Sequence, residues 1–82
     1  MRKKMPFMVV SFSTTEDAMD MESKAGEKGI PGRIISLPPE IDASCGMAWA
    51  VPLDDADGLA DKLSQAGVPY DRITLVELYA RI

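Results

Sequence analysis

Two tripeptides, Gly29-Ile30-Pro31 and Gly67-Val68-Pro69, decide the fold because they close two similar halves of the chain. They lie 38 positions apart, at 29 and 67, and each follows a segment with apolar residues at helical spacing. A glycine with a proline two residues later is typical of a helix end. At the same offset the apolar positions of both segments coincide, as Ala18 with Ala56, Met21 with Leu59 and Ala25 with Leu63. The sequence therefore predicts two copies of one helix-containing unit.

Four segments with strand character surround the two predicted helices. Residues 5–12 (MPFMVVSF) and 47–51 (MAWAV) are almost continuously apolar, as strands buried on both faces are. Residues 32–37 (GRIISL) and 71–79 (DRITLVELY) are the other two. Trp49 lies within the third strand, so we expect it in the core with a partner for its indole N–H.

Polar residues indicate where each helix begins. Ser13 and Glu16 have the spacing of a capping box for the first helix. Asp54 or Asp55 is the expected N-cap of the second helix.

Two βαβ units in tandem predict an α+β fold of the ferredoxin-like βαββαβ type, with a four-stranded antiparallel sheet and two helices on one face. The usual strand order, 4-1-3-2, places the two continuously apolar strands in the centre. We expect residues 1–82 to form one such domain, with residues 1–5 as a flexible basic tail. A chance likeness between two amphipathic helices is the alternative explanation of the repeat.

Composition excludes several classes of function. The net charge of −4 and the pI of about 4.6 argue against a nucleic-acid partner. No stretch approaches the roughly 20 apolar residues of a membrane helix, and we expect a cytoplasmic protein. The chain has one cysteine and no histidine, so it forms no internal disulfide and offers no zinc site, iron–sulfur site or Cys-His catalytic pair. No cofactor is expected.

Cys45 is the one distinctive chemical group. The predicted topology places its loop beside the start of the first helix, where unpaired N–H groups and the helix dipole favour a thiolate. Prolines stiffen the approach to the cysteine, and the following glycine gives access to it. The residues expected to surround Cys45 are Ser13, Thr14, Thr15, Pro38, Pro39, Ser44 and Gly46.

A structural role for Cys45 is the competing interpretation. Free cysteine is among the most often buried residues, and a cysteine at the start of a strand can simply fill the core. The carboxylates of Glu40 and Asp42 also disfavour a thiolate nearby. Composition alone favours the structural interpretation.

Residues 38–48 (PPEIDASCGMA) resemble the signature of the "putative selenium/sulfur carrier protein-like" family of short bacterial proteins. The common pattern is a proline-rich turn followed about seven residues later by Ser-Cys-Gly. The flanking plan is similar as well, from Phe7 to about Leu78. The sequence departs from the family at Glu40, where a basic residue is expected, and at Asp42, where serine is commoner.

The resemblance implies a carrier whose cysteine, here Cys45, holds sulfur or selenium as a persulfide or selenosulfide. It further implies a cysteine desulfurase or similar lyase as donor, and an acceptor protein. The chain would then be a carrier more than a stand-alone enzyme.

The rival interpretation is a non-catalytic ferredoxin-like interaction or regulatory module with a structural cysteine. Its edge strands, residues 32–37 or 72–79, could pair with a second copy to form a homodimer. An exposed, reactive Cys45 favours the carrier, and a buried, inert Cys45 favours the module.

Overall fold

The computed structural model describes residues 4–43 and 45–79. Its strands and helices follow one another in the predicted order βαββαβ. The elements are β1 (Lys4–Ser11), α1 (Thr15–Lys28), β2 (Arg33–Ser36), β3 (Met47–Pro52), the 3₁₀ turn η1 (Leu53–Asp55), α2 (Leu59–Ala66) and β4 (Arg72–Tyr79). Two residues assigned to the basic tail belong to β1, because Lys4 and Met5 pair with Tyr79 and Leu78 of β4. The rest of that tail, and Ser44, lie outside the described residues.

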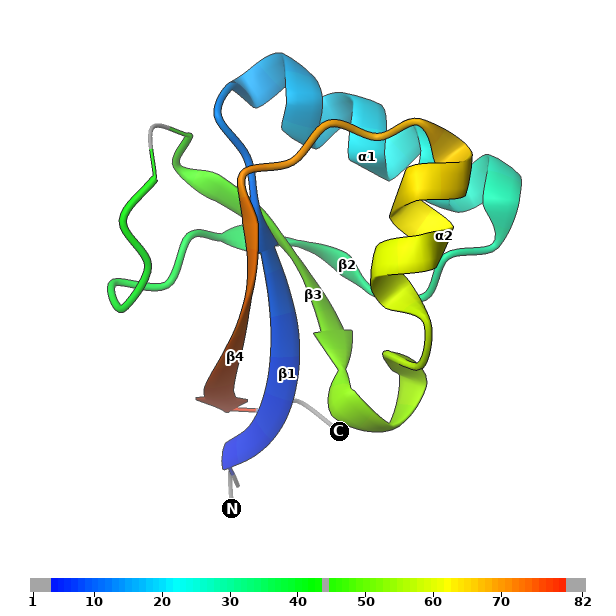
Figure 1. Ribbon diagram of the computed structural model, residues 1–82. Helices are drawn as coiled ribbons and strands as arrows, with labels where there is room; N and C mark the ends of the chain where they lie inside the picture. The colour runs from blue at the N-terminus through cyan, green and yellow to red at the C-terminus, as the bar shows by residue number, and fades with distance from the viewer. Residues whose placement is uncertain (1–3, 44, 80–82) are drawn as a thin grey trace.

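The four strands form one antiparallel sheet in the order β2-β3-β1-β4 (Figure 1). This is the predicted ferredoxin-like order read from the other edge, so that prediction is confirmed. β1 and β3 are the central strands, and Val10 of β1 lies opposite both Trp49 of β3 and Ile73 of β4. The two continuously apolar segments therefore occupy the two positions in which a strand is enclosed on both sides.

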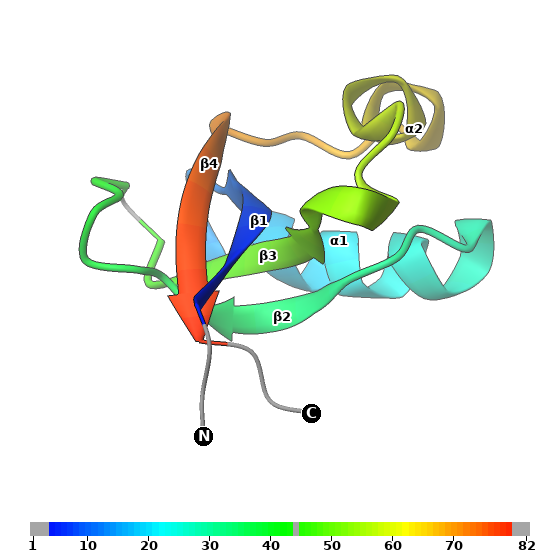
Figure 2. The same ribbon diagram turned by 90° about the horizontal axis from the view of Figure 1, so that it is seen from below.

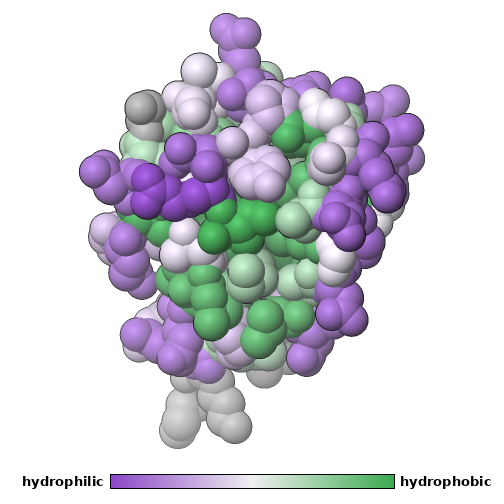
Figure 3. Space-filling model, in the orientation of Figure 1, coloured by the Kyte–Doolittle hydropathy of each residue, from purple (hydrophilic) through white to green (hydrophobic). Residues whose placement is uncertain are grey.

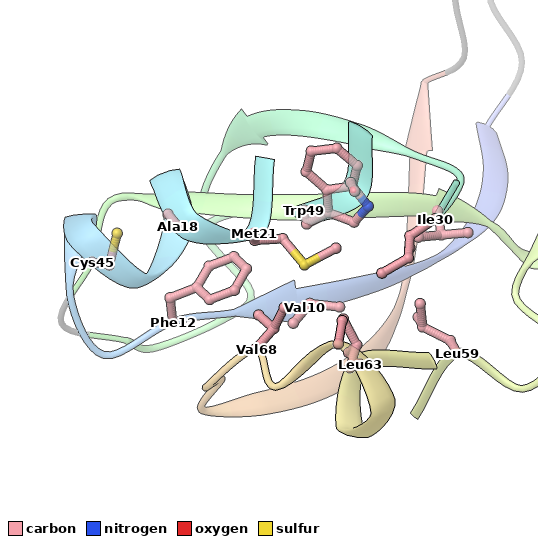
Figure 4. Close-up of a cluster of buried hydrophobic side chains, with 13 residues drawn as sticks. Val10, Phe12, Ala18, Met21, Ile30, Cys45, Trp49, Leu59, Leu63 and Val68 are labelled. Atoms are coloured by element: carbon pink, nitrogen blue, oxygen red, sulfur yellow. The ribbon is translucent and has the colours of Figure 1, made fainter. Parts of the chain in front are cut away.

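Both helices lie on one face of the sheet, as predicted (Figure 2). The main hydrophobic core fills the space between the helices and this face, which we call the helix face. Helix residues such as Met21 and Leu63 meet strand residues such as Val10 and Val51 there, and these four side chains are fully buried (Figure 4).

The opposite face of the sheet, which we call the open face, carries a second hydrophobic cluster. Val9 and Ala48 are completely buried there although no helix covers them. Their cover comes from the long loop between β2 and β3, residues 37–46, which contributes Ile41 with only 5% of its surface exposed. This loop leads directly to Cys45.

The internal repeat is visible in the helices, but its second copy is interrupted. Moved by 38 positions, the bounds of α1 become residues 53–66, the first residue of η1 and the last of α2. Gly58 stands between the two pieces with φ of +67°, a left-handed conformation that breaks the helix there. The repeat thus sets where both segments begin and end, and Gly58 divides the second.

The predicted N-caps are wrong for both helices. Thr14 caps α1, because its Oγ1 accepts the N–H of Asp17 at 3.1 Å, a role we assigned to Ser13. α2 begins after Gly58 without a side-chain cap, since Asp54 and Asp55 lie within η1.

The helix ends are as predicted. Gly29 and Gly67 both adopt the left-handed conformation of a C-cap, with φ of 69° and 71°. The next residue in each repeat then folds back: Ile30 N–H donates to the Ala25 carbonyl and Val68 N–H to the Leu63 carbonyl, both at 3.1 Å. The two tripeptides therefore perform the same task in each half.

Trp49 ties the first tripeptide to the central sheet. Only 5% of the residue's surface is exposed, and its Nε1–H donates to the Pro31 carbonyl at 2.9 Å. The partner expected for the indole N–H is therefore a backbone group next to the end of α1, and the prediction of a core position is confirmed.

Replacing this side chain tests the packing of the central strands. We expect Trp49→Ala to lower the free energy of unfolding by about 3–5 kcal/mol, because it empties a large core site and leaves a carbonyl without its donor. Urea denaturation followed by far-ultraviolet circular dichroism measures the change. Met19→Ala, at a position 63% exposed on α1, is the control and should alter stability by less than about 0.5 kcal/mol. An unchanged midpoint for Trp49→Ala would contradict the placement of β3.

Candidate functional site

Cys45 lies at the end of the loop before β3, against the first turn of α1 (Figure 4). Its thiol is 3.9 Å from the Thr15 hydroxyl oxygen, close enough for the S–H to donate. The backbone N–H of Met47 donates to the sulfur in turn, at 3.4 Å. The predicted proximity of Cys45 to the start of the first helix is therefore confirmed.

The thiol is buried, however, with 3% of the residue's surface exposed. Cys45 belongs to the main hydrophobic core, which also holds Phe12 and Ala18 beside it. The loop holds Cys45 inward. A hydrogen bond joins the two ends of this loop, in which Leu37 N–H donates to the Gly46 carbonyl at 2.9 Å. Of the two interpretations that the sequence leaves open, the burial agrees with the structural one, in which the cysteine fills the core just before a strand.

The other predicted site residues differ in their contacts and exposure. Thr15 contacts the thiol, whereas the Thr14 side chain is occupied in capping α1. Pro38 is buried and its carbonyl accepts Ile41 N–H at 3.0 Å, so it shapes the loop, while Pro39 is exposed. Gly46 is exposed, and apart from its two chain neighbours no atom of the described residues lies within 4 Å of the position where a side chain would begin. The space beside Gly46 is therefore open, as a route of access requires.

A shallow cavity of about 340 Å³ adjoins this end of the molecule. Ser13, from the turn before α1, lines it and is the one predicted site residue among the described residues that does so. The remaining lining residues are Asp42, Ala43, Asp71 and Arg72. The cavity is therefore shared by the cysteine-bearing loop, the start of α1 and the start of β4.

Asp71 and Arg72 are the residues that sequence reasoning missed. Their side chains form an ion pair, with Nε of Arg72 3.2 Å from a carboxylate oxygen of Asp71. The hydroxyl of Ser11, which is completely buried, donates to the same carboxylate oxygen at 3.5 Å and to the Arg72 carbonyl at 3.3 Å. The signal was available, because a βαββαβ topology brings the start of the last strand to the edge where the first strand ends.

The family follows from comparison with known proteins. A sequence model described as "Putative Se/S carrier protein-like" matches residues 7–75, most of the chain, including Cys45 and the loop that carries it. The chain belongs to this family. No curated protein and no solved structure matches it.

Two further features are absent from the described residues. Within residues 4–43 and 45–79, no three cysteine or acidic side chains cluster in a way that could hold a metal ion. None of the helices in the same ranges is both long and apolar enough to cross a membrane.

The burial of the thiol predicts slow alkylation. We expect iodoacetamide to modify Cys45 in the native protein at least about tenfold more slowly than in urea, because the reagent must await a local opening. Mass spectrometry of quenched time points measures both rates. Ser13→Cys supplies an exposed thiol at the same end of the molecule as the matched control. Equal rates for Cys45 in the native and unfolded protein would contradict the burial.

Proposed function

We propose that the protein carries one sulfur or selenium atom on Cys45, as a persulfide or selenosulfide. The observation that carries the proposal is the family match, which spans the one cysteine of the chain. The described contacts suit this role: the Met47 N–H already donates to the sulfur, and the Thr15 hydroxyl lies within reach. Both groups would stabilise negative charge on Cys45 when the carried atom leaves.

The transfer is a thiol–persulfide exchange that needs no oxidant. The Cys45 thiolate attacks the outer sulfur of a persulfide on the donor, a cysteine desulfurase or similar lyase. A bond forms between Cys45 and that sulfur, while the donor's sulfur–sulfur bond breaks and releases the donor thiolate. An acceptor thiolate then attacks the same atom and returns Cys45 to a thiolate. A cytoplasmic location, where single thiols stay reduced, is part of the proposal.

Because Cys45 is buried, the donor must expose the thiol before it can transfer sulfur. An incoming persulfide must reach a sulfur enclosed by Phe12, Ala18 and the first turn of α1. The open space at Gly46 and the cavity lined by Ser13 and Arg72 are the two approaches at this end of the molecule. Binding of the donor against these residues would supply the free energy that exposes the thiol. Pro38 and Pro39 would then hold the rest of the loop in shape, with Ser44, outside the described residues, next to the thiol in sequence.

Loading of Cys45 is measured directly. After incubation with a cysteine desulfurase and cysteine, intact-mass spectrometry should show one added sulfur atom on Cys45, which dithiothreitol removes. Cys45→Ala should acquire none while it keeps the circular dichroism of the parent. Ser13→Cys in the Cys45→Ala background asks whether any thiol at this end suffices, and we expect it to remain unloaded. Loading of that variant, or no loading of the parent, would refute the assignment to Cys45.

The burial of Cys45 also supports the second candidate, an interaction or regulatory module in which the cysteine is structural. A core role makes stability depend on the size and polarity of the side chain. Under this interpretation Cys45→Asp unfolds the protein or lowers its free energy of unfolding by several kcal/mol, and no donor loads the parent. Because the thiol is buried under both interpretations, urea denaturation of the variant tests only its role in the core, and the loading experiment on the parent separates the two functions.

A further inference from the structure

The helix layer covers only part of the sheet and leaves β4 bare. α1 packs over β3 and β2, and the eight-residue α2 does not extend over β4 (Figure 2). On the helix face of β4, Leu75 is 59% exposed and Ile73 is half-buried. Met8, opposite Leu75 on β1, is also half-buried. Figure 3 shows the resulting hydrophobic surface, which runs over β4 and β1 toward α2.

β4 is also an edge strand, and its two charged residues, Arg72 and Glu77, flank an uncharged centre. Strands at sheet edges are normally kept apart from other chains by charged side chains, especially lysine, by proline, by bulges or by short length. β4 has eight residues, and its central stretch 73–76 (ITLV) carries none of these devices. β2, the other edge, has only four residues, begins with Arg33 and is overlain by α1.

We propose that β4 pairs with β4 of a second copy of this chain, antiparallel and with Leu75 opposite its own counterpart. The pairing would join two four-stranded sheets into one of eight strands. It rests on the edge and surface of β4 and is independent of the function of Cys45.

The register follows from faces and charges. In a two-fold antiparallel pair, residues directly opposite each other lie on the same face, so their numbers must add to an even sum. A shift in one direction would set Asp71 opposite Glu77 of the partner twice, which is repulsive. A shift in the other would set Leu75 opposite the partner's Glu77. The register centred on Leu75 avoids the Asp71–Glu77 repulsion, sets the half-buried Ile73 and not the exposed Leu75 opposite the partner's Glu77, and places the two exposed leucines side by side.

The small size of the contact sets its strength. One pair of strands buries less than the roughly 800 Å² per partner that is usual for a stable complex. We therefore expect a reversible dimer that forms in the micromolar range. The contact is self-complementary, because Leu75 of each chain faces Leu75 of the other. This favours a second copy of the chain over an unrelated peptide as the partner.

Sedimentation equilibrium of the full chain tests the proposal at about 1 to 500 μM, concentrations that span the expected micromolar dissociation constant. The mass should rise from the 8.9 kDa of the monomer toward twice that value. Leu75→Lys should abolish the rise with unchanged circular dichroism. Met19→Lys, at an equally exposed apolar position on α1, is the matched control and should dimerise like the parent. A monomer at every concentration, or equal effects of both lysines, would overturn the proposal.

Two measurements distinguish strand pairing from packing of the hydrophobic surfaces face to face. Backbone amides of β4 that point outward should gain protection from hydrogen exchange at high concentration. Leu75→Cys should form an intermolecular disulfide under mild oxidation, identified by peptide mapping, whereas Met19→Cys should not. Dimerisation without new amide protection in β4, or without the Leu75→Cys cross-link, would refute the proposed pairing.

Discussion

The antiparallel pairing of β1 with β3 is the constraint on which the rest of the structure depends. The two strands are joined from Phe7–Pro52 to Ser11–Ala48, and both carry apolar side chains on both faces. Each face therefore needs a cover. The helices cover one, and the loop of residues 37–46 covers the other through Ile41. The loop that carries Cys45 is thus a structural cover on the open face through Ile41, while its cysteine packs into the core on the helix face.

Much of the fold could be predicted because the deciding signals are local and repeated. The Gly-Ile-Pro and Gly-Val-Pro tripeptides end both helices as expected, and the two continuously apolar segments are the central strands. The N-terminal boundaries failed for a physical reason. Ser13 and Thr14 are adjacent and equally able to cap, so the local backbone conformation decides between them. Gly58 was overlooked because apolar spacing continues on both sides of it, although its backbone conformation breaks the helix.

The candidate site was predictable in its position and not in its exposure. Topology alone brings Cys45 to the start of α1, and the contact with Thr15 follows from that. Whether the thiol faces water depends on how the loop returns to β3. That path is determined by contacts that the local sequence does not encode. Examples are the packing of Ile41 on the open face and the hydrogen bond from Leu37 N–H to the Gly46 carbonyl. Asp71 and Arg72 reach the same end of the molecule at the start of β4, sixty residues after their partner Ser11, and no local residue pattern links them to the site without the topology.

The contact between Trp49 and Pro31 has an optical consequence. The chain has a single tryptophan, and its indole is buried and hydrogen-bonded to one backbone carbonyl. Its fluorescence therefore reports one environment, the junction where α1 ends and β2 begins. The indole and the thiol of Cys45 are part of the same packed cluster, with Met21 between them in Figure 4. The protein thus contains its own spectroscopic probe, and a rearrangement of the core around the cysteine can be followed by the colour and lifetime of its emission.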